Sequence, residues 1–151
     1  GIATNINMSE VEVSGTSSVI ADTYVGALIG ILSSDDVSNY SQIQNCSSNA
    51  SVTAGSYISG FIGNADSPFG PAVGFIKNSY STGNVTGDVY VGQFLGTDSG
   101  EIPVENNFAT GTVSGNSYTG FIGANWSKDY SSNYSTDDCF GCNSGGVTSK
   151  R

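Results

Sequence analysis

An internal repeat constrains the fold of this chain more than any other feature. Four segments with a tyrosine among apolar residues, each ending in glycine, align over eight positions. They are 23–30 (TYVGALIG), 56–63 (SYISGFIG), 89–96 (VYVGQFLG) and 116–123 (NSYTGFIG). The final glycines follow one another at about 27–33 residues, a period that indicates stacked units, each unable to bury its apolar face alone.

Two shorter segments recur with the first. One precedes each copy, at 12–15 (EVSG), 51–54 (SVTA), 84–87 (NVTG) and 112–115 (TVSG), and another lies at 43–45 (IQN), 76–78 (IKN) and 104–106 (VEN). The apolar residues alternate in short runs between glycines, which is the periodicity of strands rather than of helices. A propeller blade would need about 40 residues and four strands. We therefore expect an all-β, right-handed β-solenoid (β-helix) of about four coils of about 27–33 residues, with three short strands per coil.

We expect residues 1–151 to form one β-solenoid domain, because this length is typical of a single domain. The expected coils are approximately 5–30, 43–63, 76–96 and 104–123, with 124–151 as a C-terminal cap. We expect no cap at the N-terminal end of the array. The ends of such a column expose strand edges that pair with any similar strand.

The repeat also predicts columns of equivalent side chains. We expect inward columns at Val13, Val52, Val85 and Val113; at Leu28, Phe61, Phe94 and Phe121; and at Ile43, Ile76 and Val104. Corner positions with positive φ are expected at Asn45, Asn78 and Asn106, where stacked amides can hydrogen-bond between coils. A second corner, where a Cβ would clash, is expected at Gly30, Gly63, Gly96 and Gly123.

The order Gly-x-Val-[Ser/Thr]-Gly, apolar segment ending in Gly, then Ile-x-Asn-[Ser/Cys]-Tyr resembles the GLUG motif. GLUG-type repeats occur in large secreted and surface proteins, including adhesin-like proteins and non-catalytic parts of bacterial immunoglobulin-A peptidases. The resemblance covers about residues 5–148, and 133–150 resembles the stretch that often closes such an array. It implies an extracellular or cell-surface location and no shared catalytic residues. The insertion around Ile31–Ser41 and the acidic Glu10 and Glu12 depart from the motif.

Charge and composition exclude several classes of function. The net charge is −9, and the only cations are Lys77, Lys128, Lys150 and Arg151, so we expect no nucleic-acid partner and no docking on anionic lipid. No apolar run approaches the length of about 18 residues that membrane insertion needs. The chain has no histidine, which removes Ser–His and Cys–His nucleophiles and the commonest metal ligand. We expect no enzyme, no metal site and no cofactor.

Acidic residues and cysteines leave some alternatives open. We interpret Asp35, Asp36, Asp98, Glu101, Asp137 and Asp138 as solvated turn residues, with Ca²⁺ at such a turn as the alternative. Cys139 and Cys142 form a disulfide with each other, or one of them pairs with Cys46; the odd thiol pairs with another chain or stays buried. Seven Asn-x-[Ser/Thr] sites are candidates for N-glycosylation, or simply turn residues: Asn7, Asn39, Asn45, Asn49, Asn84, Asn125 and Asn133.

One predicted surface is a candidate binding site. If Val52, Val85 and Val113 point inward, their neighbours form an uncharged outward surface, here called the Thr/Asn wall. It consists of Asn49, Ser51, Thr53, Thr82, Asn84, Thr86, Thr110, Thr112 and Ser114. The wall is either a solvent-facing strand surface or a binding plane for a polysaccharide, a neighbouring fibre or ice. Tyr57, Tyr80, Tyr90, Phe108 and Tyr118 either line a sugar platform or fill corners and core.

These observations favour a non-catalytic structural or adhesive module of a secreted or cell-surface protein. A subunit of an extracellular filament, assembled through the ends or walls of the solenoid, is the first alternative. Glycan or ice binding through the Thr/Asn wall is the second. The expected partners are other copies or further repeats of the same protein, and cell-surface glycans.

Overall fold

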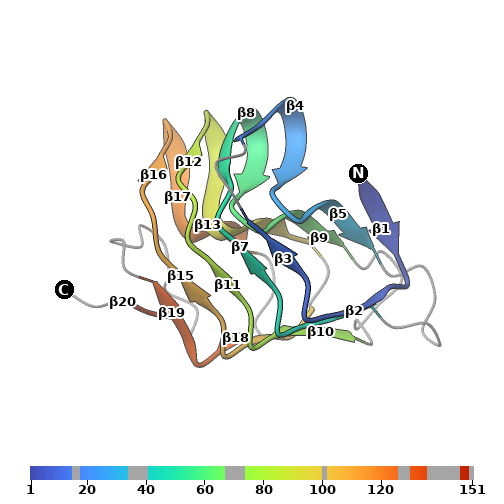
Figure 1. The fold of residues 1–151 in the computed structure, drawn as a ribbon. Coiled ribbons are helices and arrows are strands. Elements are labelled where there is room, and N and C mark those ends of the chain that lie inside the picture. The colour runs from blue at the N-terminus through green and yellow to red at the C-terminus, as the bar shows by residue number, and fades with distance from the viewer. Residues whose placement is uncertain are drawn as a thin grey trace.

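A computed structural model describes residues 1–14, 18–33, 41–66, 74–99, 102–125, 130–135 and 147–149. The described chain is all-β and consists of short strands in three parallel sheets, here called A, B and C (Figure 1). Every strand pair in these sheets is parallel, so the all-β prediction is confirmed and the arrangement is β-helix-like.

Sheet A contains β1 (Ile2–Thr4), β4 (Ser18–Gly26), β5 (Ile29–Ser33), β8 (Ser51–Ser59), β9 (Ile62–Asp66), β12 (Val85–Thr86), β13 (Val89–Asp98), β16 (Val113–Ser114) and β17 (Ser117–Asn125). Sheet B contains β2 (Asn7–Ser9), β6 (Ser41–Gln44), β10 (Gly74–Lys77), β14 (Val104–Glu105) and β18 (Tyr130–Ser131). Sheet C contains β3 (Glu12–Val13), β7 (Ser47–Ser48), β11 (Tyr80–Ser81), β15 (Phe108–Ala109), β19 (Asn133–Ser135) and β20 (Val147–Ser149).

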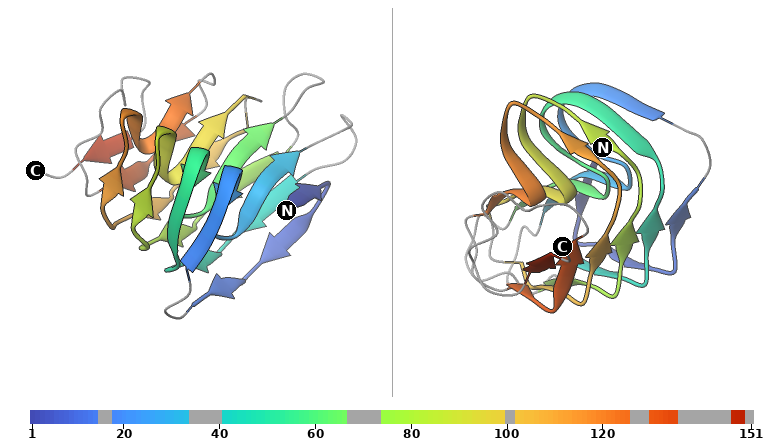
Figure 2. Two further views of the ribbon diagram at one scale, coloured as in Figure 1. Left: turned by 90° about the horizontal axis from the view of Figure 1, so that it is seen from above. Right: turned by 90° about the vertical axis from the view of Figure 1, so that its left-hand side faces the viewer.

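The chain passes through the sheets in turn and returns to each one a repeat later. Hydrogen bonds from one repeat to the next join residues 35, 33, 28 and 26 positions apart in the sequence. We use the word layer for the strands that lie at the same level of the three sheets. Figure 2 (right) looks roughly along the stack, so that successive layers overlap.

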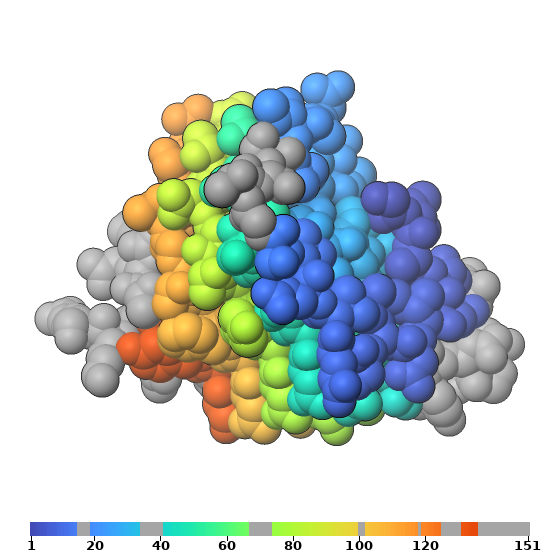
Figure 3. All heavy atoms as spheres, in the orientation of Figure 1, coloured from blue at the N-terminus to red at the C-terminus, as the bar shows by residue number. Residues whose placement is uncertain are grey.

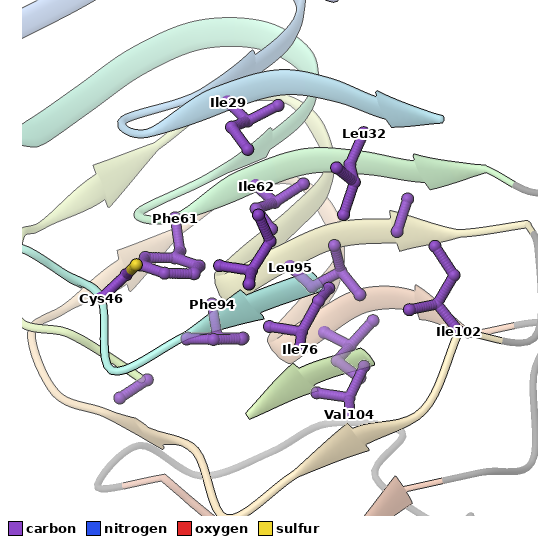
Figure 4. Close-up of a cluster of buried hydrophobic side chains, with 14 of the residues drawn as sticks. Ile29, Leu32, Cys46, Phe61, Ile62, Ile76, Phe94, Leu95, Ile102 and Val104 are labelled. Atoms are coloured by element: carbon purple, nitrogen blue, oxygen red, sulfur yellow. The ribbon is translucent and has the colours of Figure 1, made fainter. Parts of the chain in front are cut away.

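The main core is a set of stacked side chains inside the layers (Figure 4). Phe61, Phe94 and Phe121 are fully buried, and their rings stack at centroid distances of 4.5 and 5.2 Å. Ile76 pairs in register with Ile43 on one side and with Val104 on the other. The predicted column of Ile43, Ile76 and Val104 is therefore confirmed, and so is the predicted stack of Phe61, Phe94 and Phe121. Leu28, which was predicted to continue this stack, is half-buried and packs against the core. Such aromatic pairs contribute about 0.5–1.5 kcal/mol each beyond their buried area.

Sheet A encloses a second, smaller core that the sequence did not predict. Its buried residues are Val25, Val52, Ile58, Val85 and Val91. Residues 89–92 of β13 pair with β8, whereas residues 95–98 pair with β9. Val91, in the first of these segments, lines the second core together with Val85 of β12, whereas Leu95, in the other segment, belongs to the main core. Strands β4, β8, β12 and β16 lie in the lobe at the top of Figure 1.

Glycines allow close backbone contact beside this second core. A Cβ built on Gly96 would lie 2.4 Å from the carbonyl oxygen of Gly63, and one on Gly63 would lie 2.6 Å from that of Gly30. No real Cβ atom approaches backbone so closely, so the predicted clash is confirmed. The glycines lie inside strands β5, β9, β13 and β17, however, and not at a corner.

The predicted left-handed corner is also confirmed. Asn45, Asn78 and Asn106 have φ values of 54°, 52° and 54°, a region in which asparagine is favoured among non-glycine residues. The buried side-chain amides that form hydrogen bonds between layers lie one residue after such a corner, and not at the corner itself. Asn107 accepts from the Ser79 N–H at 3.0 Å through Oδ1, and its own N–H donates to Asn133 Oδ1 at 3.0 Å.

The first repeat aligns differently from the prediction. Val13 pairs with Ser48, whereas Val19 pairs with Val52. Val13 therefore does not belong to the Val52–Val85–Val113 column, and its predicted place there was wrong. The motif at 12–15 resembles the later copies, but its strand β3 pairs with β7, and β4 is the strand that pairs with β8. Four residues separate β3 from β4, whereas two separate β7 from β8, so the residue equivalent to Val52 comes later in the chain.

Candidate binding surfaces

The Thr/Asn wall lies on the outer face of the stack, where the strands of sheet C continue toward the lobe. From Asn49 to Thr53, and again from Thr82 to Thr86, side chains alternate between exposed and buried. Thr110 is half-buried, and the remaining wall residues are exposed. Figure 3 shows successive layers side by side on the face turned to the viewer.

The wall residues stack in columns across three layers. Thr53, Thr86 and Ser114 are register partners, and so are the Val52, Val85 and Val113 residues beneath them. The Thr112 N–H donates to Asn84 Oδ1 at 3.0 Å, which ties two layers together through a wall side chain. Adjacent layers are about 4.8 Å apart. The wall thus presents hydroxyl and amide groups, which both donate and accept hydrogen bonds, at a regular spacing and without charge.

Apolar and aromatic residues border the wall. Ile20 continues the Thr53 column into the first layer and is 78% exposed. Tyr80, Phe108 and Tyr134 are register partners in sheet C, with Tyr80 46% and Phe108 38% exposed. The rings of Phe108 and Tyr134 stack at 5.2 Å, so the faces of these rings cover one another. A sugar stacks on the face of an aromatic ring, so this pair does not form a flat sugar platform.

The tyrosines of the lobe form a second stack. Tyr24, Tyr57 and Tyr90 stack at 4.8 Å, and all three have positive φ values, which no sequence signal predicted. Tyr57 and Tyr90 are half-buried. Their ring faces are also occupied by neighbours, which disfavours the sugar-platform interpretation. The side chain of Tyr118 lies outside the described residues.

Cys46 is a free, fully buried thiol whose Sγ–H donates to the Gln44 carbonyl oxygen at 3.1 Å. The structure therefore shows Cys46 as a buried thiol and not as part of a disulfide, which were the two alternatives. Cys139 and Cys142 lie outside the described residues. Cys46 fills the main core as a small apolar side chain.

The candidate glycosylation sites differ in exposure. Asn7, Asn45, Asn49 and Asn84 are exposed, whereas Asn39 and the side chain of Asn125 lie outside the described residues. Asn133 is buried, and its Nδ2, the atom that would carry a glycan, donates to the Val104 carbonyl oxygen at 2.6 Å. The fold therefore uses the Asn133 amide internally, which disfavours a glycan at this site in the folded protein.

The acidic residues give no clustered site in the described part of the chain. Asp98 is fully buried within β13, in register with Ala65, so its interpretation as a solvated turn residue was wrong. Asp35, Asp36, Glu101, Asp137 and Asp138 lie outside the described residues. The described residues contain no group of three or more Cys, Asp or Glu placed to hold a metal ion, and no helix that could cross a membrane.

The first layer exposes side chains whose equivalents one layer further in are buried. Val11 precedes β3 as Cys46 precedes β7, and Val11 is 37% exposed whereas Cys46 is fully buried. Met8 and Val19 are half-buried, although their register partners Ile43 and Val52 are buried.

No family model, curated protein or solved structure matches this chain. A functional conclusion therefore rests on the fold and on the Thr/Asn wall and first layer described above.

Proposed function

We propose that this chain is a right-handed β-solenoid of about four coils that serves as a non-catalytic structural and adhesive module of an extracellular or cell-surface protein. The parallel registers, which repeat every 26 to 35 residues, support the solenoid. The GLUG-like motifs support the secreted setting. Rigidity follows from the architecture, since every layer is bonded to its neighbours along three sheets.

The Thr/Asn wall is the observation that supports adhesion. It presents nine uncharged hydroxyl and amide side chains in columns over three layers, almost all of them exposed. A surface of this kind binds a neutral, hydroxyl-rich ligand through many hydrogen bonds without a charge to desolvate. We propose that the ligand is a neutral glycan of a cell surface or matrix.

Ice binding through the same wall has less support. It would require columns of identical spacing and chemistry, and Ser51, Asn84 and Thr112 are three different residues at equivalent positions. The Asn84 amide is also engaged with the backbone of the next layer.

The test is binding of the monomeric protein to a panel of neutral polysaccharides and to intact cells. Thr86→Lys places a charge at the centre of the wall, while Gln42→Lys places the same charge on sheet B. We expect binding by the unaltered chain and by Gln42→Lys, and loss of binding with Thr86→Lys. Equal binding by the two variants would contradict the wall as the contact surface, and no binding to any glycan or cell would contradict the adhesive function.

A further inference from the structure

The aromatic residues of sheet C and the Thr/Asn wall form one continuous surface. Exposed and buried side chains alternate from Tyr80 to Thr86, so Tyr80 points to the same side as the wall residues that follow it. Phe108, the register partner of Tyr80, precedes the wall residue Thr110 in the same way. The backbone N–H groups of Phe108 and Thr110 donate to carbonyl groups of the layer before, at 3.0 and 2.8 Å. The layers are therefore bonded together on both sides of the boundary between aromatic and hydroxyl side chains.

Tyr80, Phe108 and Tyr134, here called the aromatic column, border the wall over three layers. The rings of Phe108 and Tyr134 stack along the column, so their edges point outward. Tyr80 is 46% and Phe108 38% exposed, so these edges are open to a ligand on the wall. The edge of an aromatic ring is apolar and carries a partial positive charge. It therefore suits a methyl group and a carbonyl oxygen, whereas the flat face of a sugar needs a ring face.

The charges around this surface exclude anionic ligands. Asp88 lies two residues after Thr86 at the other border of the wall, is exposed, and accepts from Asn116 Nδ2 at 2.5 Å. Lys77, the only Lys or Arg in the described part of the chain, lies on sheet B with its Nζ 3.8 Å from the centroid of the Phe75 ring. A carboxylated or sulfated glycan would find no counter-charge at the wall and would be repelled by Asp88.

A neutral sugar that carries an acetamido group matches both parts of the surface. Its amide N–H donates to a hydroxyl or amide oxygen of the wall, as its ring hydroxyls do. Its methyl group and carbonyl oxygen contact the ring edges of the aromatic column. A plain hexose offers hydroxyl groups alone, so it uses the wall and leaves the aromatic column without a contact.

We propose that the wall and the aromatic column together bind neutral glycans that contain N-acetylhexosamine, and that the aromatic column selects them over glycans of unsubstituted hexoses. The proposal rests on the adhesive function proposed above and names its class of ligand. Burial of one methyl group against an apolar surface changes an affinity by about fourfold. Contacts from one or two acetamido groups therefore give a preference that a titration can measure.

The test compares chito-oligosaccharides with cello-oligosaccharides of equal length, which share a backbone and a linkage and differ in an acetamido or hydroxyl group on each sugar. Titration of the full chain, followed by NMR or calorimetry, gives both affinities. We expect the chito-oligosaccharide to bind about threefold to tenfold more tightly. Hyaluronan oligosaccharides carry acetamido groups and carboxylates together, and we expect them to bind more weakly than the chito-oligosaccharide.

Two variants of the aromatic column test its role in this preference. Tyr80→Ser and Phe108→Ser each remove an exposed ring, and Ser47 already occupies the position that pairs with Tyr80 in the layer before. We expect each variant to bring the ratio of the two affinities toward one. Phe75→Ser removes a half-buried ring from sheet B and should leave the ratio unchanged.

An NOE measurement on the unaltered chain provides a readout that does not depend on the folding of a variant. We expect cross-peaks between the acetyl methyl groups of the chito-oligosaccharide and ring protons of Tyr80 or Phe108. Equal affinities for the two probes, a ratio that persists in both variants, or the absence of these cross-peaks would overturn the proposal. Equal binding of both probes would leave the adhesive function intact, whereas binding of neither would contradict the adhesive function as well.

Discussion

Phe94 lies face to face with Phe61, with ring centroids 4.5 Å apart and ring planes 15° apart. Phe121 continues the stack on the other side of Phe94 at 5.2 Å. Phe94 therefore has a ring against each of its faces, and no part of it reaches solvent.

Truncating this central ring should open a cavity between two layers. We expect Phe94→Ala to lower the free energy of unfolding by about 3–5 kcal/mol in urea denaturation. Phe108→Ala removes the same side chain from an exposed position and should cost less than about 2 kcal/mol. Similar losses for the two variants would contradict the stack.

The glycine column gives a second prediction. A Cβ on Gly96 would lie 2.4 Å from the Gly63 carbonyl oxygen and 2.8 Å from the Ile58 nitrogen, and these backbone atoms cannot move without separating layers. We expect Gly96→Ala to cost at least about 1–3 kcal/mol of unfolding free energy. At Gly115 the nearest atoms are side-chain methyl groups of Val91 and Thr119, so Gly115→Ala should cost less. The opposite order would show that the backbones are not in contact at Gly96.

The left-handed corner gives a third prediction, which compares two substitutions at one position. Asn78 has a φ of 52°, which glycine adopts freely and a β-branched residue strongly resists. We expect Asn78→Val to lower the unfolding free energy by about 1–3 kcal/mol and Asn78→Gly to change it by less than about 1 kcal/mol. If thermal and urea unfolding showed valine to be as well tolerated as glycine, the corner would have a different conformation.

Glycosylation gives a fourth prediction, for the chain secreted from a eukaryotic host. Asn84 is exposed, whereas the Asn133 amide nitrogen donates to a buried carbonyl group. Peptide mass spectrometry of the folded, secreted protein should find glycans at Asn84 but none at Asn133. A glycan at Asn133 in the folded protein would contradict the buried amide, and Asn84 serves as the internal control.

Much of the layered arrangement could be predicted from the repeat. Phe61 and Phe94 occupy equivalent positions in two copies of equal length. Aligning the copies in the sequence therefore predicts that the two rings stack in the structure. Asn45, Asn78 and Asn106 were placed at the corner because asparagine tolerates positive φ, and all three adopt it. Equal spacing and a residue with a distinct backbone preference are strong signals in parallel stacked strands.

The predictions that failed concern positions where short motifs are ambiguous. The sequence around Val13 and Val19 does not show which of the two valines is the equivalent of Val52. Only the pairing of β4 with β8 identifies it as Val19. The alternation of apolar and polar residues could not predict the second core, because the pattern around an inward-pointing valine is the same for both cores. Burial of Asn133 depends on contacts with Val104 and Asn107, which its own sequence neighbours do not encode.

The most direct test of the layered fold is a methyl NOE experiment on the folded protein. The registers place Ile76 between Ile43 and Val104, one layer from each. We expect strong methyl cross-peaks for Ile43–Ile76 and Ile76–Val104. Ile43–Val104 should give none of similar strength, because two layers are about 9–10 Å apart. Absence of the two neighbouring cross-peaks, or a strong Ile43–Val104 cross-peak, would contradict the stacking on which the Thr/Asn wall depends.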